Sequence, residues 1–125
     1  MINTESLKKT DDFRLVYKKG TSCADKYIVL YVRENGLSKN RLGISCSKKV
    51  GNSVIRHRFS RLVREVYRLH ENIFNSGLDI VVVARSRSRD AGYFDIERSL
   101  LDLAGKSHLR KNDEASHEES TDISD

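Results

Sequence analysis

Long apolar runs are missing from this chain. The two longest, Ile28–Val32 and Ile80–Ala84, are far too short to span a bilayer, so no membrane-spanning segment is expected. The first nine residues, MINTESLKK, contain no apolar stretch of the kind found in secretory signals. We therefore expect a cytoplasmic protein.

Cysteine is scarce, and the motifs of several enzyme classes are absent. Cys23 and Cys46 match no metal-binding or redox spacing, so both are expected to be reduced thiols. The four histidines have no companions at ligand spacing, which argues against a zinc site. The chain has no G-x-S-x-G, H-E-x-x-H or phosphate-loop motif, and its acidic residues form no cluster suited to two metal ions. We predict no catalytic residue and no metal site in this chain.

Acidic residues are few outside the C-terminal end. Six of the 18 lie in the last thirteen residues, which contain no Lys or Arg. Residues 1–112 therefore hold 23 basic against 12 acidic residues, a net charge of +11. A small domain this basic usually has a polyanion as its partner, so nucleic acid is favoured over a basic protein without such a partner.

The 125 residues, of which 38% are hydrophobic, are enough for one core. Periodicity predicts, in order, a helix over 11–20, strands over 26–33 and 41–47, a helix over 52–75, a strand over 78–85 and a helix over 93–106. A further strand boundary is expected within 26–46. The strand, helix and strand over 41–85 form a βαβ unit, which implies a parallel pair. After Lys106 the chain becomes polar and then acidic, so we expect one domain over 1–106 and a disordered tail over 107–125.

The segment Ser47–Arg68, SKKVGNSVIRHRFSRLVREVYR, combines positive charge with an apolar stripe. On a helical wheel the stripe comprises Ile55, Phe59, Leu62, Val66 and Leu69, bordered by Val63. A separate polar arc comprises Arg56, His57, Ser60, Arg61, Arg64 and Arg68. The stripe predicts packing against a sheet, while Lys48, Lys49 and the backbone amides at the helix start add positive potential. The polar arc is either a solvated face or a phosphate-binding strip, and the second is favoured because only Glu65 offers an acidic partner within it.

The same segment resembles the signature of the bacterial ribonuclease P protein component. That family has a Lys-Lys-x-Gly-Asn turn, then a helix built on Arg-Asn-Arg followed by Arg-Leu-x-Arg-Glu. DDFRLVYKKG is similar to the family's first helix, YIVLYV to its first strand, RLGISCSKKVG to the strand before the motif, and DIVVVAR to its last strand. The likeness covers residues 5–106. His57 departs from the usual Asn, and Ser60 stands where a basic residue is common.

The resemblance implies a fold and a function. The fold is a small two-layer α/β (α+β) sandwich of order α-β-β-β-α-β-α with a left-handed βαβ crossover, whereas patterning alone predicts a right-handed one. The function is that of the protein subunit of ribonuclease P, which binds the catalytic RNA and the 5′ leader of precursor tRNA. The RNA subunit holds most of the Mg²⁺ and cleaves off the leader. We expect the free protein to be monomeric.

The resemblance also implies the site residues. Contacts to the catalytic RNA and its phosphates are expected from Lys48, Lys49, Asn52, Arg56, His57, Arg58, Arg61, Arg64 and Arg68. The leader-binding cleft is expected at Phe13, Tyr17 and Tyr31, although patterning alone favours ordinary packing for these rings. Arg85–Arg89 is either a phosphate contact or a solvated loop.

Two other functions compete with this one. A structural RNA-binding protein of ribosomal type would show the same basic helix without taking part in cleavage. A DNA-binding regulator is weakest, because the basic helix is followed by a strand and not preceded by a short helix and tight turn.

Overall fold

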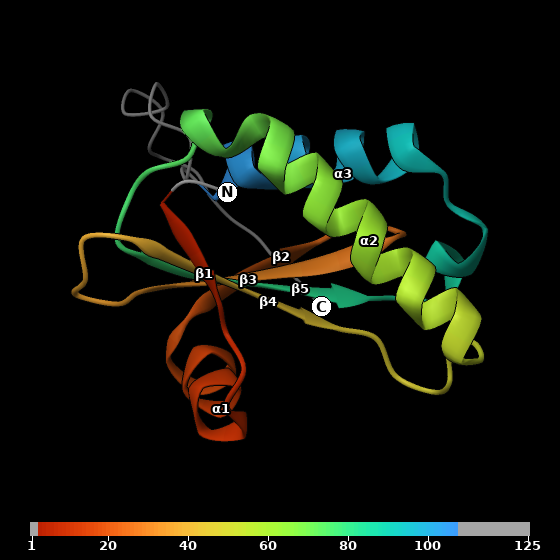
Figure 1. Cartoon of the computed structure of the whole chain (residues 1–125), viewed down its shortest axis with the longest axis horizontal. Coiled ribbons are helices and arrows are strands. Elements are labelled where there is room, and N and C mark those ends of the chain that lie inside the picture. Colours follow the sequence, from red (N-terminus) through yellow and green to blue (C-terminus); the bar gives the residue numbers. More distant parts are fainter. Residues whose placement is uncertain (1–2, 108–125) are drawn as a thin grey trace.

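A five-stranded sheet forms the middle of the protein (Figure 1). The computed structural model describes residues 3–107. In sheet order the strands are β1 (Thr4–Ser6), β4 (Asn40–Ser45), β5 (Leu78–Ala84), β3 (Ile28–Glu34) and β2 (Thr21–Ala24). β1, β4 and β5 run parallel, whereas β3 is antiparallel to both of its neighbours.

Helices lie on both faces of this sheet. α2 (Ser53–His70) and α3 (Tyr93–Lys106) cover one face, and α1 (Thr10–Lys19) lies on the other (Figure 1). Two short 3-10 helices, η1 (Glu71–Ile73) and η2 (Ser86–Asp90), flank β5 in the chain. The order α-β-β-β-α-β-α is confirmed, with the short β1 added before α1. The extra strand is β2, which lies before the segment in which the sequence placed it.

The main core lies between the sheet and the two helices α2 and α3. Its largest fully buried side chains include Ile28, Leu30, Phe59, Tyr67, Ile80, Ile96, Leu100 and Leu103. A smaller cluster on the other face packs α1 onto the sheet through Val16, Leu7 and Val81. β5 is therefore covered on both faces, as its continuous apolar sequence predicts.

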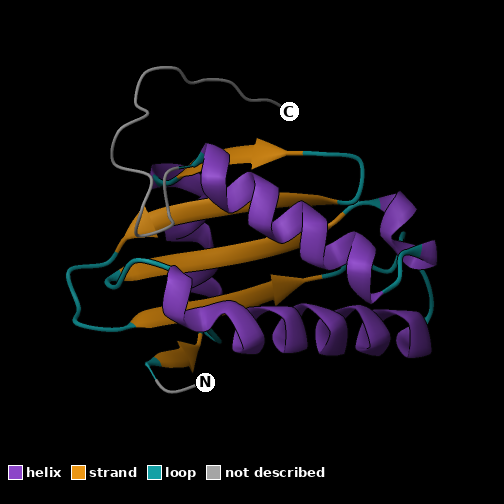
Figure 2. Cartoon of the chain, turned by 90° about the horizontal axis from the view of Figure 1, so that it is seen from above, coloured by secondary structure: helices purple, strands orange, loops and turns teal. Residues whose placement is uncertain are grey.

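The connection from β4 through α2 to β5 is left-handed. Figure 2 views the sheet with α2 and α3 toward the reader and with β1, next to the N-terminus, at the bottom. β4 and β5 both point to the right, and β5 lies above β4 (Figure 2). When the strands are turned to point upward, the chain thus moves to the left as it passes through the helix in front. The crossover implied by the family resemblance is confirmed, against the general right-handed preference.

α2 is rolled about its axis relative to the orientation that the sequence predicts. Its buried residues are Phe59, Val63, Val66 and Tyr67, whereas Leu69 is 51% exposed. On a wheel this is a roll of about 60–70°. The cause lies in Tyr67, whose hydroxyl is 2.9 Å from the Thr4 hydroxyl and accepts a 3.1 Å hydrogen bond from the Asn40 side chain. These bonds tie α2 to β1 and β4 and satisfy a buried phenol that the wheel placed outside the stripe.

α1 ends at Gly20 for a steric reason. Its φ of −83° is ordinary, so no left-handed conformation is needed there. A Cβ at this position would lie 2.6 Å from the carbonyl oxygens of Val16 and Val32, so only glycine lets the chain turn so close to β3.

Within residues 3–107, no helix has the length and apolar character needed to cross a membrane. Of the predicted tail over 107–125, only Ser107 belongs to the described residues, where its hydroxyl lies 2.9 Å from the Cys23 sulfur.

Candidate nucleic-acid interface

The turn between β4 and α2 presents two lysines to solvent. A backbone hydrogen bond of 3.1 Å closes the turn at Val50, whose buried side chain anchors it, and Lys48 and Lys49 are exposed. Asn52 then caps α2, because its side-chain oxygen accepts a 3.0 Å hydrogen bond from the backbone of Ile55. The oxygen of Asn52, a predicted RNA contact, is thus engaged in beginning the helix.

The roll of α2 decides which basic side chains face solvent. The exposed ones are His57, Arg58, Arg61, Arg64 and Arg68. Together they form the α2 basic strip, which runs for about 16 Å at 1.5 Å per residue. The helical wheel did not include Arg58 in the polar arc, but in the structure Arg58 is exposed and belongs to this strip.

Arg56 lies at the edge of the strip and turns toward the sheet. It lines an open pocket of about 250 Å³ with Ile44, Cys46, Ser53, His57 and Ser60. Its Nε is buried and has no hydrogen-bond partner among the described residues. Burial raises the pKa of the Cys46 thiol, against the opposing charge of Arg56, so this sulfur is neutral at neutral pH. Both departures from the family signature, His57 and Ser60, line the same pocket.

Two arginines of the strip already have partners within the protein. Arg68 donates to the Glu65 carboxylate at 2.7 Å, and this hydrogen bond lowers the pKa of Glu65. Glu65, the one acidic residue that the sequence offers as a partner for the polar arc, is therefore paired with Arg68. Arg58 donates to the carbonyl oxygen of Ala91 at 2.7 Å, which directs it toward the chain before α3. Arg61 and Arg64 make no ion pair with the described residues, so they are free to meet phosphate.

The three predicted leader-binding residues meet on the opposite face of the sheet. The ring centroids of Phe13 and Tyr17 are 6.3 Å apart, and those of Tyr17 and Tyr31 are 4.8 Å apart in an edge-to-face arrangement. Tyr17 is 39% exposed, whereas Phe13 and Tyr31 are half-buried and pack against the smaller apolar cluster. We refer to these three residues as the aromatic cluster. Tyr31 thus supports the fold and is also partly exposed to solvent.

Gly43 creates the space in which Phe13 sits. A Cβ at this position of β4 would lie 2.7 Å from the tip of the Phe13 ring and 3.1 Å from Leu7. The ring therefore rests directly on the backbone of the sheet. Beyond it, the same face continues through the half-buried side chains of Ser45, Val83 and Val29, which are paired across β4, β5 and β3.

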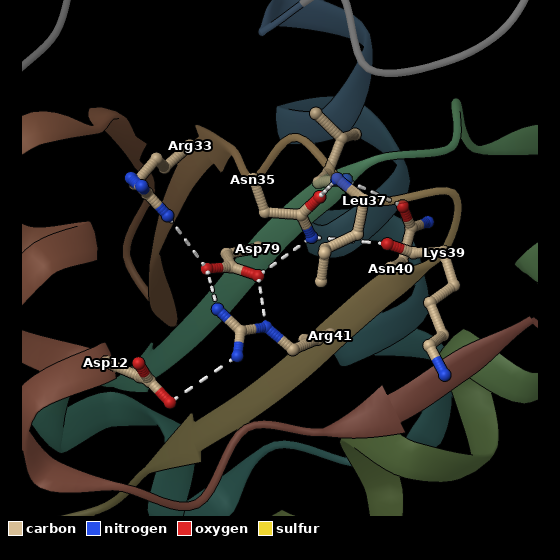
Figure 3. Close-up of polar contacts among 9 residues, drawn as sticks. Asp12, Arg33, Asn35, Leu37, Lys39, Asn40, Arg41 and Asp79 are labelled. Atoms are coloured by element: carbon tan, nitrogen blue, oxygen red, sulfur yellow. Dashed lines mark hydrogen bonds and ion pairs between the residues drawn. The ribbon is translucent and has the colours of Figure 1, made fainter.

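A buried charge network fixes α1 on the sheet at the other end of this face (Figure 3). The Asp79 side chain is fully buried and receives two hydrogen bonds of 2.8 Å from Arg41. Arg33 donates to it at 3.2 Å and Asn35 at 3.0 Å. Arg41 also lies 3.5 Å from Asp12 of α1 (Figure 3).

The network explains the ionisation of Asp79. Burial alone raises the pKa of this carboxyl and is the largest single effect, but the hydrogen bonds from Arg41 and Asn35 oppose it. Together with the charges of Arg41 and Arg33, these hydrogen bonds outweigh burial and hold the pKa below its ordinary value. This site was not predicted, although an aspartate inside the apolar run LDIVVVA indicates that a charged partner must lie nearby.

The metal chemistry of the interface is limited. Within residues 3–107, no group of three or more His, Cys, Asp or Glu side chains is placed to hold a metal ion. His70 instead pairs with Glu97 at 2.8 Å between α2 and α3.

The chain that carries these features is similar to known proteins over most of its length. The family model described as Ribonuclease P matches residues 1–108. The chain belongs to the ribonuclease P protein family. The ribonuclease P protein component of Lachnoclostridium phytofermentans is 60% identical over 101 residues, which cover 81% of this chain and 87% of the relative. That of Alkaliphilus metalliredigens is 46% identical and covers 87% and 98% of the two chains.

Solved structures of the family have the same fold. The RNase P protein of Staphylococcus aureus is 36% identical and superposes with a TM-score of 0.78, covering 85% of this chain and 97% of that one. The protein from Thermotoga maritima is 33% identical with a TM-score of 0.73, covering 79% and 94%. As a ribonuclease P protein, the chain is a subunit of a ribonucleoprotein endoribonuclease in which the RNA carries out catalysis. The ribosomal-type alternative is not favoured.

Proposed function

We propose that the two faces of this ribonuclease P protein bind two different RNAs. The turn at Lys48 and Lys49 and the α2 basic strip, with Arg56 and Asn52 at its start, bind the phosphate backbone of the catalytic RNA. The aromatic cluster binds the single-stranded 5′ leader of precursor tRNA. Mg²⁺ is held mainly by the RNA subunit, and the protein acts as a monomer in the cytoplasm.

The charge of the strip supports the first assignment. Arginines present planar donor groups that bind phosphate with two hydrogen bonds, and only Glu65 interrupts the positive charge of the exposed face. The helix start adds the dipole of α2 to the charge of the two lysines.

The aromatic cluster is the single observation that carries the second assignment. Residues from α1 and β3 bring three rings together on one face of the sheet. Packing within the protein does not bury this cluster completely, since Tyr17 remains exposed. Unpaired bases stack on exposed aromatic rings, with little dependence on base identity. The half-buried surface beyond the rings leads along β4 toward Lys48 and Lys49, so that a leader on one face and the catalytic RNA on the other approach the same turn.

Removing charge from α2 should weaken binding of the catalytic RNA. We expect Arg64→Ala and Arg56→Ala each to lower the magnitude of the slope of log K against log salt by about one. The matched control is Arg98→Ala on the exposed side of α3, which should leave the slope unchanged. Filter binding over a salt series measures the slope, with circular dichroism to show that each variant is folded. Slopes equal to that of the unmodified protein for both variants would mean that α2 is only a solvated face.

The direct test of the proposed function is reconstitution with the catalytic RNA of a related bacterium. At an Mg²⁺ concentration too low for the RNA alone to work well, adding this protein should increase cleavage of precursor tRNA at the leader junction. Tight binding of the RNA without any gain in cleavage would contradict the proposal and restore a purely structural role.

A further inference from the structure

The end of the sheet that holds the start of α2 carries a second set of basic residues. β5 leads directly into η2, whose sequence SRSRD contains Arg87 and Arg89. In Figure 1 this segment (teal, at the right) lies beside the start of α2. α2 and η2 are in contact, and Arg58 of the α2 basic strip donates to Ala91 just after η2.

η2 is held in a fixed shape by hydrogen bonds. Ser88 is 2% exposed, and both its hydroxyl and its backbone N–H donate to the carbonyl oxygen of Arg85, at 2.7 and 2.9 Å. Arg85 in turn donates from its backbone to Tyr27 at 2.9 Å and from its guanidinium to the carbonyl of Asp25 at 3.0 Å. η2 is thus fastened to the turn between β2 and β3, so little backbone entropy is lost when its outward side chains bind a partner.

Arg87 and Arg89 stand on either side of the buried Ser88. Both are exposed, and neither makes an ion pair with the residues that the structure describes. Asp90 is the only carboxylate of η2, so the segment from Arg85 to Asp90 keeps a net charge of +2. The carboxylate of Asp25 is engaged by the backbone N–H groups of the β2–β3 turn.

We infer that Arg87 and Arg89 of η2 bind backbone phosphates of the catalytic RNA and extend the α2 basic strip sideways across the end of the sheet. This rests on the RNA-binding role proposed above for α2. The catalytic RNA is the partner because η2 packs against α2, whereas the aromatic cluster proposed to bind the leader lies beneath the opposite face. A run of phosphates that crosses α2 near Arg58 and Arg61 would continue over η2.

The test is a double variant, Arg87→Gln with Arg89→Gln, which keeps most of each side chain and removes two charges. We expect the slope of log K against log salt for the catalytic RNA alone to fall in magnitude by about two, and affinity near 0.15 M salt to fall on the order of tenfold. The control is Arg98→Gln with Lys106→Gln, two exposed residues of α3 that change the net charge equally. It should change the slope much less. Urea unfolding of both double variants shows whether the fold is intact.

Two results would overturn the inference. If both double variants change the slope equally, η2 contributes only general charge. If the η2 variant binds the catalytic RNA normally and loses affinity for precursor tRNA in the holoenzyme, the arginines contact the substrate instead. Neither result affects the outcome for Arg64→Ala, so failure here is distinguishable from failure of the proposed role of α2.

Discussion

Replacing Asp79 with Asn is expected to lower the free energy of unfolding by about 3–5 kcal/mol. The carboxylate is fully buried and is the common partner of Arg41 and Arg33. An amide of the same shape leaves both guanidinium groups partly buried without their counter-charge. Since Arg41 also reaches Asp12, the change should loosen α1 and with it the aromatic cluster.

The same site predicts a pH dependence. Because the pKa of Asp79 is lowered in the folded state, its contribution is fully present above the unfolded-state value of about 3.9. It is lost as the pH falls from there through the lowered folded-state pKa. The difference in stability between the unmodified protein and Asp79→Asn should therefore be constant from pH 7 to about pH 5 and shrink below about pH 4.

Urea unfolding at several pH values measures both effects. The matched control is Glu5→Gln, which removes one carboxylate from the exposed ion pair between Glu5 and Lys39. It should cost less than about 1 kcal/mol. Equal losses for the two variants at pH 7 would show that the network of Asp79 contributes no more than a surface pair.

Replacing Tyr31 with Leu should cost about 1–3 kcal/mol of holoenzyme affinity for precursor tRNA and almost nothing for mature tRNA. Tyr31 packs against the smaller apolar cluster, so Ala would also open a cavity there. Leu keeps apolar volume in this position and removes the aromatic face. Tyr17→Leu should act in the same direction, because Tyr17 is the more exposed ring and meets Tyr31 edge-to-face.

The control for both variants is Phe94→Leu, a 73% exposed aromatic residue on α3, away from the aromatic cluster. It should leave both affinities unchanged. The loss for Tyr31→Leu should also depend weakly on leader sequence, because stacking does not involve the hydrogen-bonding edges of the base. If precursor and mature tRNA lose affinity equally, Tyr31 supports the fold or the catalytic RNA, and the leader binds elsewhere.

Local patterns predicted the elements of this fold well. α3 spans the predicted residues. β5 is buried on both faces, as predicted from an apolar run in which polar and apolar residues do not alternate. The three-residue β1 was missed, since so short a strand is defined by its pairing with β4 and has no periodicity of its own. The handedness of the crossover likewise depends on long-range packing, and only the family resemblance indicated it.

The sequence predicted which basic residues belong to the site more accurately than it predicted the direction in which α2 presents them. The apolar periodicity predicted the position of α2 correctly but its rotation about the helix axis wrongly. Tyr67 is buried through hydrogen bonds to Thr4 and Asn40, which a helical wheel does not take into account. That roll moves Arg56 toward the sheet and brings Arg58 into the exposed strip. The pairing of Arg68 with Glu65, three positions apart, was available from spacing alone and reduces the number of free arginines.

Dependence of affinity on leader length tests most directly whether this subunit holds the leader. Precursor tRNAs with leaders shortened one nucleotide at a time are bound to the catalytic RNA with and without the protein, at constant salt and Mg²⁺. We predict that affinity of the holoenzyme falls in steps once the leader becomes too short to reach the aromatic cluster, and that the RNA alone shows no such steps. Affinity of the holoenzyme that is the same for every leader length, down to mature tRNA, would contradict a leader-binding role for this protein.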